Sequence, residues 1–292
     1  MNRIGRVCAA GAVMVAMTAG GLLLSAQTTQ MPEPRRGFGA SITPAFEGWY
    51  YNPDGTRSFL VGYYNRNSQQ ELDIPIGPNN HIEPGGPDMG QPTHFLPGRQ
   101  WGMFALPAPK EFKPTDSYVW TIVANGQSIS IPFRLTPDYV MSPFSEIAVG
   151  NTPPQIRFDQ NGEVVQGPIG SFATAATRTA SVSAPLALSV SAADDMKYTS
   201  GTNAPMSTPR PPVTVRFSQY RGAGKITFDK PRPAVEKIAG AAPFNGRAST
   251  TAKFSEAGDY VIHVTANDYS GDGGGGFGCC WTTALVKVSV KP

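Results

Sequence analysis

The sequence contains little cysteine and little charge. It has three Cys in 292 residues, and charged residues make up 15% of the chain, against about 25% in an average soluble domain. So few cysteines exclude a disulfide-dense scaffold and a zinc module built on repeated Cys pairs. The formal net charge is only +3, which argues against binding to nucleic acid and against electrostatic docking on a membrane.

The signatures of common catalytic sites are also missing. The chain has no G-x-S-x-G elbow, no H-E-x-x-H pair and no Walker loop. The glycine run at 271–276 lacks the following Lys and Ser or Thr that a phosphate-binding loop needs. These absences favour a binding protein over an enzyme and leave the question of activity open.

The residues that are abundant favour β-structure. The chain has 32 Gly and 28 Pro, which supply turns, and many Val, Ile, Thr and Tyr that alternate with polar residues. No helix-period segment and no repeat of fixed length is visible. We therefore predict an all-β fold, and the length suits two domains.

The first 26 residues have the pattern of a secretory signal peptide. Arg3 and Arg6 precede an apolar run over 7–24, and the small residues Ser25 and Ala26 follow. The run is also just long enough to cross a bilayer, so an uncleaved anchor is the alternative. Cleavage would remove Cys8 and both arginines, and would leave an exported chain with two cysteines in an oxidising compartment and no further membrane span.

Residues 37–150 are predicted to form a first β-sandwich. Turn signals at 52–55 and at 125–126 each lie between alternating runs and predict two hairpins. Between them, the prolines and glycines of 73–101 predict a long loop without regular structure. Aromatic residues around the first hairpin, such as Trp49 and Tyr51, suit either stacking on sugar rings or a core, and strand alternation favours the core for at least half of them.

Residues 151–292 are predicted to form a second β-sandwich. Residues 150–168 look like a linker, and six short alternating runs follow, among them 186–192, 213–220, 259–266 and 284–290. The segment Gly258-Asp259-Tyr260 looks like the tyrosine corner that opens strand F of immunoglobulin-like sandwiches.

On these residues the second part resembles immunoglobulin-like or PKD-like bacterial domains. The wider chain, with FEGWYYNPDG and GGGGFGCCWT, also resembles a family of uncharacterised exported bacterial β-sandwich proteins. The resemblance implies a shared fold and no particular activity. The chain departs from the antibody pattern, because Ile262 stands where the second inter-sheet cysteine would be.

Acidic residues are predicted to meet at one end of the second sandwich. In this topology the loops after strands B and F share one end. Asp194 and Asp195 follow strand B, while Asp268 and Asp272 follow strand F. Residues 268–273 match the first half of a calcium loop but lack its distal Glu. These acidic residues could form a calcium site or a solvated acidic turn without a metal.

The adjacent pair Cys279-Cys280 is the other marked feature of this end. Once Cys8 is removed, no other cysteine can pair with either of them within the chain. We predict a vicinal disulfide rather than free thiols or an intermolecular bridge, and with Phe277 and Trp281 it would form an apolar platform for binding. A thiol redox role is disfavoured, because the pair lacks C-x-x-C spacing.

A second candidate metal site lies in the Pro-rich loop. His81, Glu83, Asp88 and His94 could hold a divalent metal that activates water. The competing interpretation is that these side chains satisfy the backbone of their own loop.

The sequence therefore predicts an exported, non-enzymatic binding protein that uses the B–C and F–G loop end of its second sandwich. No cofactor is required by the sequence, and calcium is the one that the acidic residues could hold; the partner would be a carbohydrate or a cell-envelope protein rather than nucleic acid. An exported metal-dependent hydrolase with its site in the 79–94 loop is the alternative.

Overall fold

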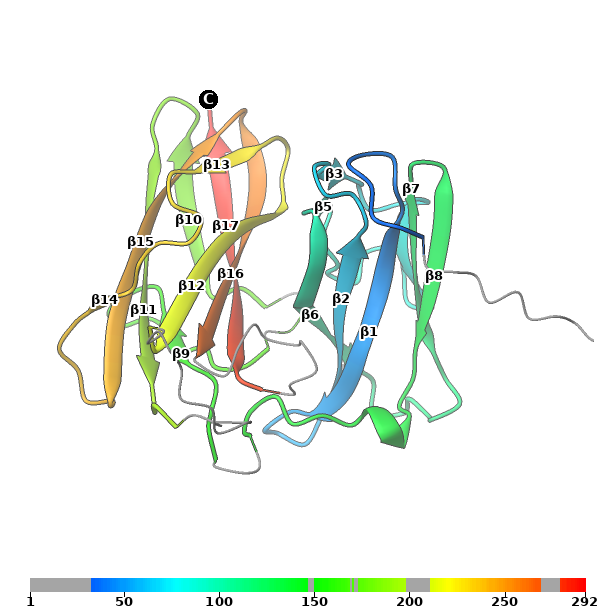
Figure 1. The fold of residues 1–292 in the computed structure, drawn as a ribbon, viewed down its shortest axis with the longest axis horizontal. Helices are drawn as coiled ribbons and strands as arrows, with labels where there is room; N and C mark the ends of the chain where they lie inside the picture. Colours follow the sequence, from blue (N-terminus) through cyan, green and yellow to red (C-terminus); the bar gives the residue numbers. More distant parts are fainter. Residues whose placement is uncertain (1–32, 147–149, 169, 171–172, 198–210, 269–278) are drawn as a thin grey trace, which may run out of the picture. The chain divides into compact units, whose positions relative to one another are not determined.

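The structure is a computed structural model that describes residues 33–146, 150–168, 170, 173–197, 211–268 and 279–292. The predicted signal peptide lies outside the described residues. The described chain is built of β-strands and one short 3-10 helix, which confirms the all-β prediction (Figure 1). No helix among these residues has the length and apolarity to cross a membrane.

The first half consists of two three-stranded sheets and a short ladder. β4 and β7 alternate between buried and less buried residues, as expected for strands with one face on a core, whereas β2 and β6 are buried along most of their length. One sheet has the order β1 (Ile42–Tyr51), β2 (Arg57–Asn65), β6 (Gly98–Ala108); the other has the order β4 (Asn80–Glu83), β7 (Tyr118–Ala124), β8 (Gln127–Phe133); β3 (Leu72–Asp73) pairs with β5 (His94–Phe95), and the helix η1 covers Pro137–Tyr139.

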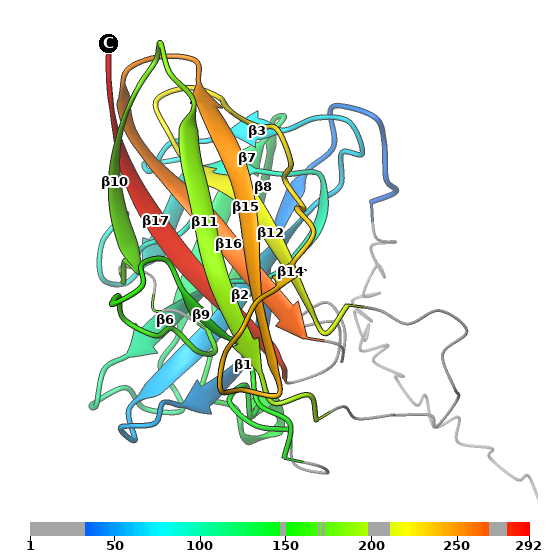
Figure 2. The same cartoon turned by 90° about the vertical axis from the view of Figure 1, so that its left-hand side faces the viewer.

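The second half is a sandwich of a four-stranded and a five-stranded sheet, seen from a second side in Figure 2. The first sheet has the order β10 (Ala176–Ser181), β17 (Trp281–Lys291), β16 (Gly258–Asp268), β12 (Val213–Arg221); the second has the order β13 (Ile226–Phe228), β15 (Phe244–Phe254), β11 (Leu186–Asp194), β9 (Gln155–Arg157), with β14 (Glu236–Lys237) also paired to β15. This is the strand arrangement of an immunoglobulin-like sandwich.

The predicted tyrosine corner is present. The Tyr260 side chain is buried, and its hydroxyl donates a hydrogen bond to the carbonyl oxygen of Glu256 at 2.9 Å. This bond fixes the turn that leads into β16, in the way typical of immunoglobulin-like strand F.

Two segments differ from the sequence prediction. Residues 80–83 form β4, residues 94–95 form β5 and β6 begins at residue 98, although we expected the Pro-rich segment 73–101 to lack regular structure. The prolines flank a proline-free run of five residues, which is long enough for an edge strand. The predicted linker contains β9, whose Ile156 lies in the core of the second sandwich, so this segment is part of the fold.

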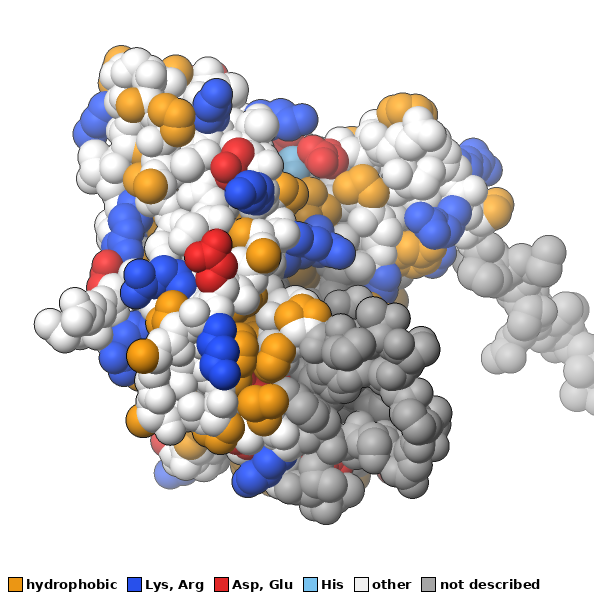
Figure 3. Space-filling view, turned by 60° about the vertical axis from the view of Figure 1, so that its left-hand side comes forward, with side chains coloured by type: hydrophobic (Ala, Val, Ile, Leu, Met, Phe, Trp, Pro, Cys, Tyr) orange, Lys and Arg blue, Asp and Glu red, His pale blue; other side chains and the backbone are white. Residues whose placement is uncertain are grey.

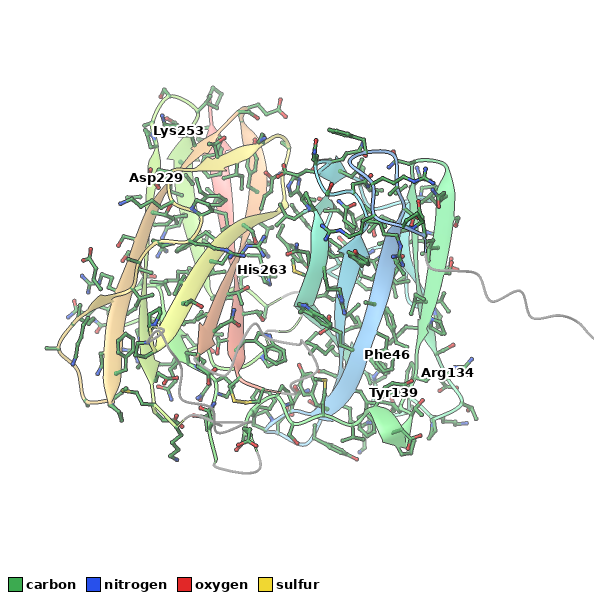
Figure 4. The ribbon with its side chains drawn as sticks, viewed as in Figure 1. Phe46, Arg134, Tyr139, Asp229, Lys253 and His263 are labelled. Atoms are coloured by element: carbon green, nitrogen blue, oxygen red, sulfur yellow. A yellow bond between two sulfur atoms is a disulfide. The ribbon has the colours of Figure 1, made fainter. Side chains whose placement is uncertain are left out.

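Each half has its own hydrophobic core, and residues 33–292 form one compact unit. Tyr220 and Leu285 of the second half pack into the first core. The Tyr220 hydroxyl donates to the Gly90 carbonyl at 2.6 Å, and His263 stacks on the Tyr220 ring with centroids 5.7 Å apart. His263, marked in Figure 4, is buried. Division into two independently folding domains at 150/151 stays a prediction.

Candidate functional site

Two inward-facing carboxylates lie at one end of the second sandwich. On β11 the buried positions are Leu188, Val190, Ala192 and Asp194, and on β16 they include Ile262, Val264, Ala266 and Asp268. Because side chains two residues apart on a strand share a face, both aspartates continue apolar rows that point between the sheets. Asp194 and Asp268 are each only 4% exposed. The end of the core therefore contains two acids where the rows predict apolar residues.

Asn151 joins this pair from the segment before β9. Its side chain is fully buried, and its Nδ2 donates to Asp268 Oδ2 at 2.6 Å. Its own Oδ1 and the Oδ2 of Asp194 are buried without a hydrogen-bond partner. A buried oxygen without a partner costs about 1–3 kcal/mol, so two of them at the end of one sandwich, where Asp268 also lies, are an unusual feature.

Charge and burial act on Asp194 in the same direction. The pKa of Asp194 is raised to about 7, chiefly by burial and further by the nearby carboxylates of Asp268 and Asp195, against one hydrogen bond from the Met196 backbone N–H that lowers it. A bound cation would relieve this repulsion directly.

Asp195 is already satisfied by its surroundings. Its Oδ2 accepts hydrogen bonds from the backbone N–H and the hydroxyl of Thr152, at 3.2 and 2.9 Å, and its Oδ1 accepts one from the Lys197 backbone at 2.9 Å. This carboxylate ties the end of β11 to residues 151–152, and so positions Asn151 beside Asp268. Asp272, the fourth predicted ligand, lies outside the described residues.

Cys279 and Cys280 are joined by a disulfide, as predicted. Their position differs from the expected exposed platform, because Cys279 is 6% exposed and Cys280 and Trp281 are each 1% exposed. The Sγ atoms of Cys280 and Cys279 lie 3.4 and 3.8 Å from the Asn151 carbonyl oxygen. The disulfide therefore packs against the segment that carries Asn151. Phe277 lies outside the described residues.

The ring of Trp281 packs on the first half of the molecule. It belongs to a small apolar cluster with Tyr50, Leu60 and Ala105, and a Cβ at Gly102 would come within 2.9 Å of its Nε1. Gly102 has a positive φ of 51°, a conformation that favours glycine. Trp281 therefore holds the beginning of β17 against β6. We call the end of the sandwich that contains Asp194, Asp268 and Asn151 the acidic end.

The residues of the alternative metal site are spread over separate contacts. His94 is buried, with Nδ1 2.8 Å from Asp73 Oδ1 and Nε2 3.7 Å from Glu71 Oε2. Asp88 forms two hydrogen bonds with the guanidinium of Arg221, at 2.9 and 3.0 Å, which lower the pKa of this carboxyl.

His81 and Glu83 line an open hollow of about 640 Å³ on β4. Nowhere in the described parts of the chain do three His, Cys, Asp or Glu side chains come together as a metal-binding group. The hydrolase therefore stays a prediction to which the described residues add no site. The same finding covers Asp194, Asp195 and Asp268, which do not form such a group of three carboxylates.

Asn151 is the member of the acidic end that the sequence analysis missed. It lies directly before Thr152 and two prolines, within what looked like a linker. The signal was weak, because the contact with Asp268 spans 117 positions. Polar residues that precede a Pro-Pro step in a segment between two sandwiches are common, and they carry no metal signature.

A second buried polar group, around Glu47, was also missed. Glu47 is the extra residue of a bulge in β1, and its carboxylate accepts from Arg99 Nη2 at 3.0 Å and from the Gly102 backbone at 2.9 and 3.0 Å. Arg99 lies over the Trp101 ring at 3.8 Å from its centroid. A bulge re-aims a side chain in a way that strand alternation does not predict.

Comparison with known proteins identifies no family. No family model matches the chain, and no curated protein matches its sequence. Among solved structures, domains 4 and 5 of the S-layer protein SbsC are similar at 11% identity and a TM-score of 0.23, over 87% of this chain and 98% of that one.

CfaE, the adhesive subunit of CFA/I fimbria of enterotoxigenic Escherichia coli, is similar at 12% identity and a TM-score of 0.22, over 89% of this chain and 83% of that one. Similarities this weak carry no argument about the function of the chain, which has to be inferred from its own residues.

Proposed function

We propose that this chain is an exported, non-enzymatic binding protein that uses the acidic end of its second sandwich, and that a calcium ion stabilises this end. The export signal supports the location, and a carbohydrate or a cell-envelope protein is the expected partner. The observation that carries the proposal is the pair of unpartnered buried oxygens, Asp194 Oδ2 and Asn151 Oδ1, beside the Asp268 carboxylate.

The ligand set is the kind that calcium prefers. Calcium takes six to eight oxygen ligands from carboxylates, amide carbonyls and water in a flexible geometry. Asp194, Asp268 and Asn151 would supply oxygens from three separate segments, and water would complete the shell. Asp195 would stay outside it and hold Asn151 in place through Thr152. A bound ion would tie β11 to β16 and to residues 150–152.

The first experiment measures thermal unfolding in a chelator and in increasing calcium. We expect calcium to raise Tm, because a ligand that binds only the folded state stabilises it by RT ln(1 + [L]/Kd), about 2.7 kcal/mol at a hundred times Kd. Asp194→Asn should lose most of this shift. Asp259→Asn is the matched control, because Asp259 lies exposed on the same strand as Asp268. No shift at about 10 mM calcium, tenfold above the weakest usual extracellular sites, would reject the ion.

The second experiment tests binding itself. The purified chain is sedimented with cell envelopes of the bacterium that produces it, in calcium and in chelator. We expect the wild-type chain and Asp259→Asn to co-sediment in calcium, and Asp194→Asn to remain in the supernatant. Equal sedimentation of Asp194→Asn would show that binding uses another surface, even if the calcium site exists.

A further inference from the structure

An open cleft of about 850 Å³ lies on the outer face of the sheet β13-β15-β11-β9, on the opposite face of β11 from the inward-facing Asp194. Its floor is the outward side of β11, where Ser189, Ser191 and Ala193 alternate with core residues. Because these side chains are small, they leave space above the outer surface of the sheet. The space above them is walled by two segments, residues 155–160 on one side and 238–242 on the other.

Two arginines stand on opposite sides of this floor. Ser191 pairs with Arg157 of β9 and with Arg247 of β15, so the three residues form one row across the sheet. Residues directly opposite each other in antiparallel strands project to the same face. Neighbouring strands are about 4.8 Å apart, so the two arginine side chains begin about 10 Å apart with the serine between them.

The guanidinium groups of Arg157 and Arg247 both have N–H donors that could bond a ligand. Arg157 donates one hydrogen bond, to the Gln160 carbonyl at 3.1 Å, and a guanidinium has five N–H donors. Within the described residues neither Arg157 nor Arg247 forms an ion pair. Asp159, the acid that lines the cleft, is paired with Arg178 at 2.8 Å. Glu236 lies opposite Arg247 on β14, beyond ion-pair distance. Figure 3 shows Lys and Arg side chains, with fewer Asp and Glu, on one face of the molecule.

The walls of the cleft are fixed by their own hydrogen bonds. On one side the Ile238 N–H donates to the Asn245 carbonyl at 2.9 Å, and Asn245 Nδ2 donates to the Ala242 carbonyl at 2.7 Å. A Cβ at Gly240 would overlap the Asn245 side chain, so glycine lets this segment lie close to the sheet. On the other side Ile156 and Val165 exchange two backbone bonds. The cleft is therefore preformed.

We propose that this cleft binds an acidic saccharide, a sugar unit that carries a carboxylate or a sulfate. Two arginines with free donors match such an anion, because the planar guanidinium binds it with two parallel hydrogen bonds. The Ser191 hydroxyl lies between the two arginines in the same row and would bond a sugar hydroxyl. Phe158, Val164 and Ile238 line the cleft and offer apolar surface to the C–H face of the ring. This site is additional to the proposed calcium-stabilised end.

The test is calorimetric titration of the full chain, in chelator, with four probes. They are an oligogalacturonate, a sulfated heparin oligosaccharide, a malto-oligosaccharide of matched length and inorganic phosphate. We expect one or both acidic oligosaccharides to bind, and whichever binds tighter identifies the anion. Equal binding of the neutral oligosaccharide, equally tight binding of phosphate, or no binding of either acidic probe would each overturn the proposal.

Single substitutions test whether the saccharide binds in this cleft. Arg157→Ala and Arg247→Ala should each weaken binding about tenfold or more, as expected for the loss of one charge-assisted hydrogen-bonded pair. Lys253→Ala is the matched control, because Lys253 is exposed on the same face of β15, six residues from Arg247 (Figure 4). It should change affinity less than about twofold by loss of general attraction alone. Equal weakening by Lys253→Ala would show unspecific attraction and overturn the cleft as the site.

Discussion

Arg99→Met should destabilise the protein by an amount that grows with pH. The substitution keeps an apolar stem and removes the charge opposite Glu47, whose side chain is 4% exposed. Burial raises the pKa of Glu47 to about 7, and Arg99 with the Gly102 N–H opposes that rise. Once Arg99 is gone, the pKa of Glu47 rises further, and above it the carboxylate is buried without a counter-charge.

The expected magnitude differs between two pH values. At pH 5 Glu47 is protonated with or without Arg99, so the variant loses the bonds that Arg99 donates to the Tyr63 and Gln100 carbonyls and its stacking on Trp101. We expect about 1–2 kcal/mol for these contacts. At pH 9 the unpaired carboxylate adds to this loss, and the total should reach about 3–5 kcal/mol, the usual cost of breaking a buried ion pair.

The sign follows from linkage. A carboxyl whose pKa is raised on folding contributes stability that is complete below about pH 4, its unfolded pKa, and that is lost as pH rises through the folded value near 7. Removing Arg99 extends that loss to higher pH. Burial lowers the pKa of His263 to about 3, which weakens the fold as pH falls instead. The His263 contribution cancels when the variant is compared with wild type at the same pH.

Urea unfolding followed by tryptophan fluorescence measures the difference at pH 5 and at pH 9. The double variant Glu47→Gln/Arg99→Met is the control, because without the carboxylate the extra cost at pH 9 should disappear. An equal loss at both pH values, or a loss below about 1 kcal/mol at pH 9, would refute the reasoning. Such a result would mean that the Gly102 N–H alone stabilises the Glu47 carboxylate.

Three further predictions concern contacts that join distant parts of the chain. Tyr220→Phe should cost about 1–3 kcal/mol, because it leaves the buried Gly90 carbonyl without its hydrogen bond; urea unfolding measures this, and an unchanged midpoint would contradict it. Asn80→Ala should cost at least as much, because Asn80 donates to two carbonyls and accepts from the Trp120 indole N–H at 2.9 Å; a cost near zero would show that water replaces these bonds. The Cys279–Cys280 disulfide should resist mild reductant in the folded chain and open in denaturant, because both sulfurs are buried. Intact mass measures the two hydrogens gained, and rapid reduction of the native protein would contradict the burial.

The hairpins and the sandwich topology could be predicted from the sequence because their signals are local. Asn125-Gly126 forms the predicted tight turn, with φ angles of 50° and 75°, and β7 and β8 pair on either side of it. Trp49, Tyr50 and Tyr63 are buried while Tyr51 is exposed, so at least half of the aromatic residues around the first hairpin are core, as predicted. The neighbours Trp49 and Tyr50 are both buried because they pack into two different apolar clusters. These features depend on neighbours along the chain.

The failures occur where a contact reaches far along the chain. Proline density around 75–87 hid β4, because a short edge strand takes its stability from pairing with β7, about forty residues later. Glycine density before Cys279 suggested exposure, whereas the pair is buried beside residues near 151. Composition describes local conformational freedom, and it does not show what will be packed on top of a segment.

The acidic end lies between these two cases. The positions of Asp194 and Asp268 follow from the two-residue period of β-strands, whereas that of Asn151 does not. The sequence placed Asp194 and Asp268 at one end through topology, as loop residues. The two-residue period also predicts the direction of both side chains. Asp194 continues the inward row of Val190 and Ala192 on β11. Asp268 continues the inward row of Val264 and Ala266 on β16, so both carboxylates face inward. An acid that ends an inward row on each of two facing sheets needs a proton, a donor or a cation, because a buried charge without one is too costly. Asn151 supplies one donor to Asp268, and the unpartnered oxygen of Asp194 is the part of this requirement that calcium would meet.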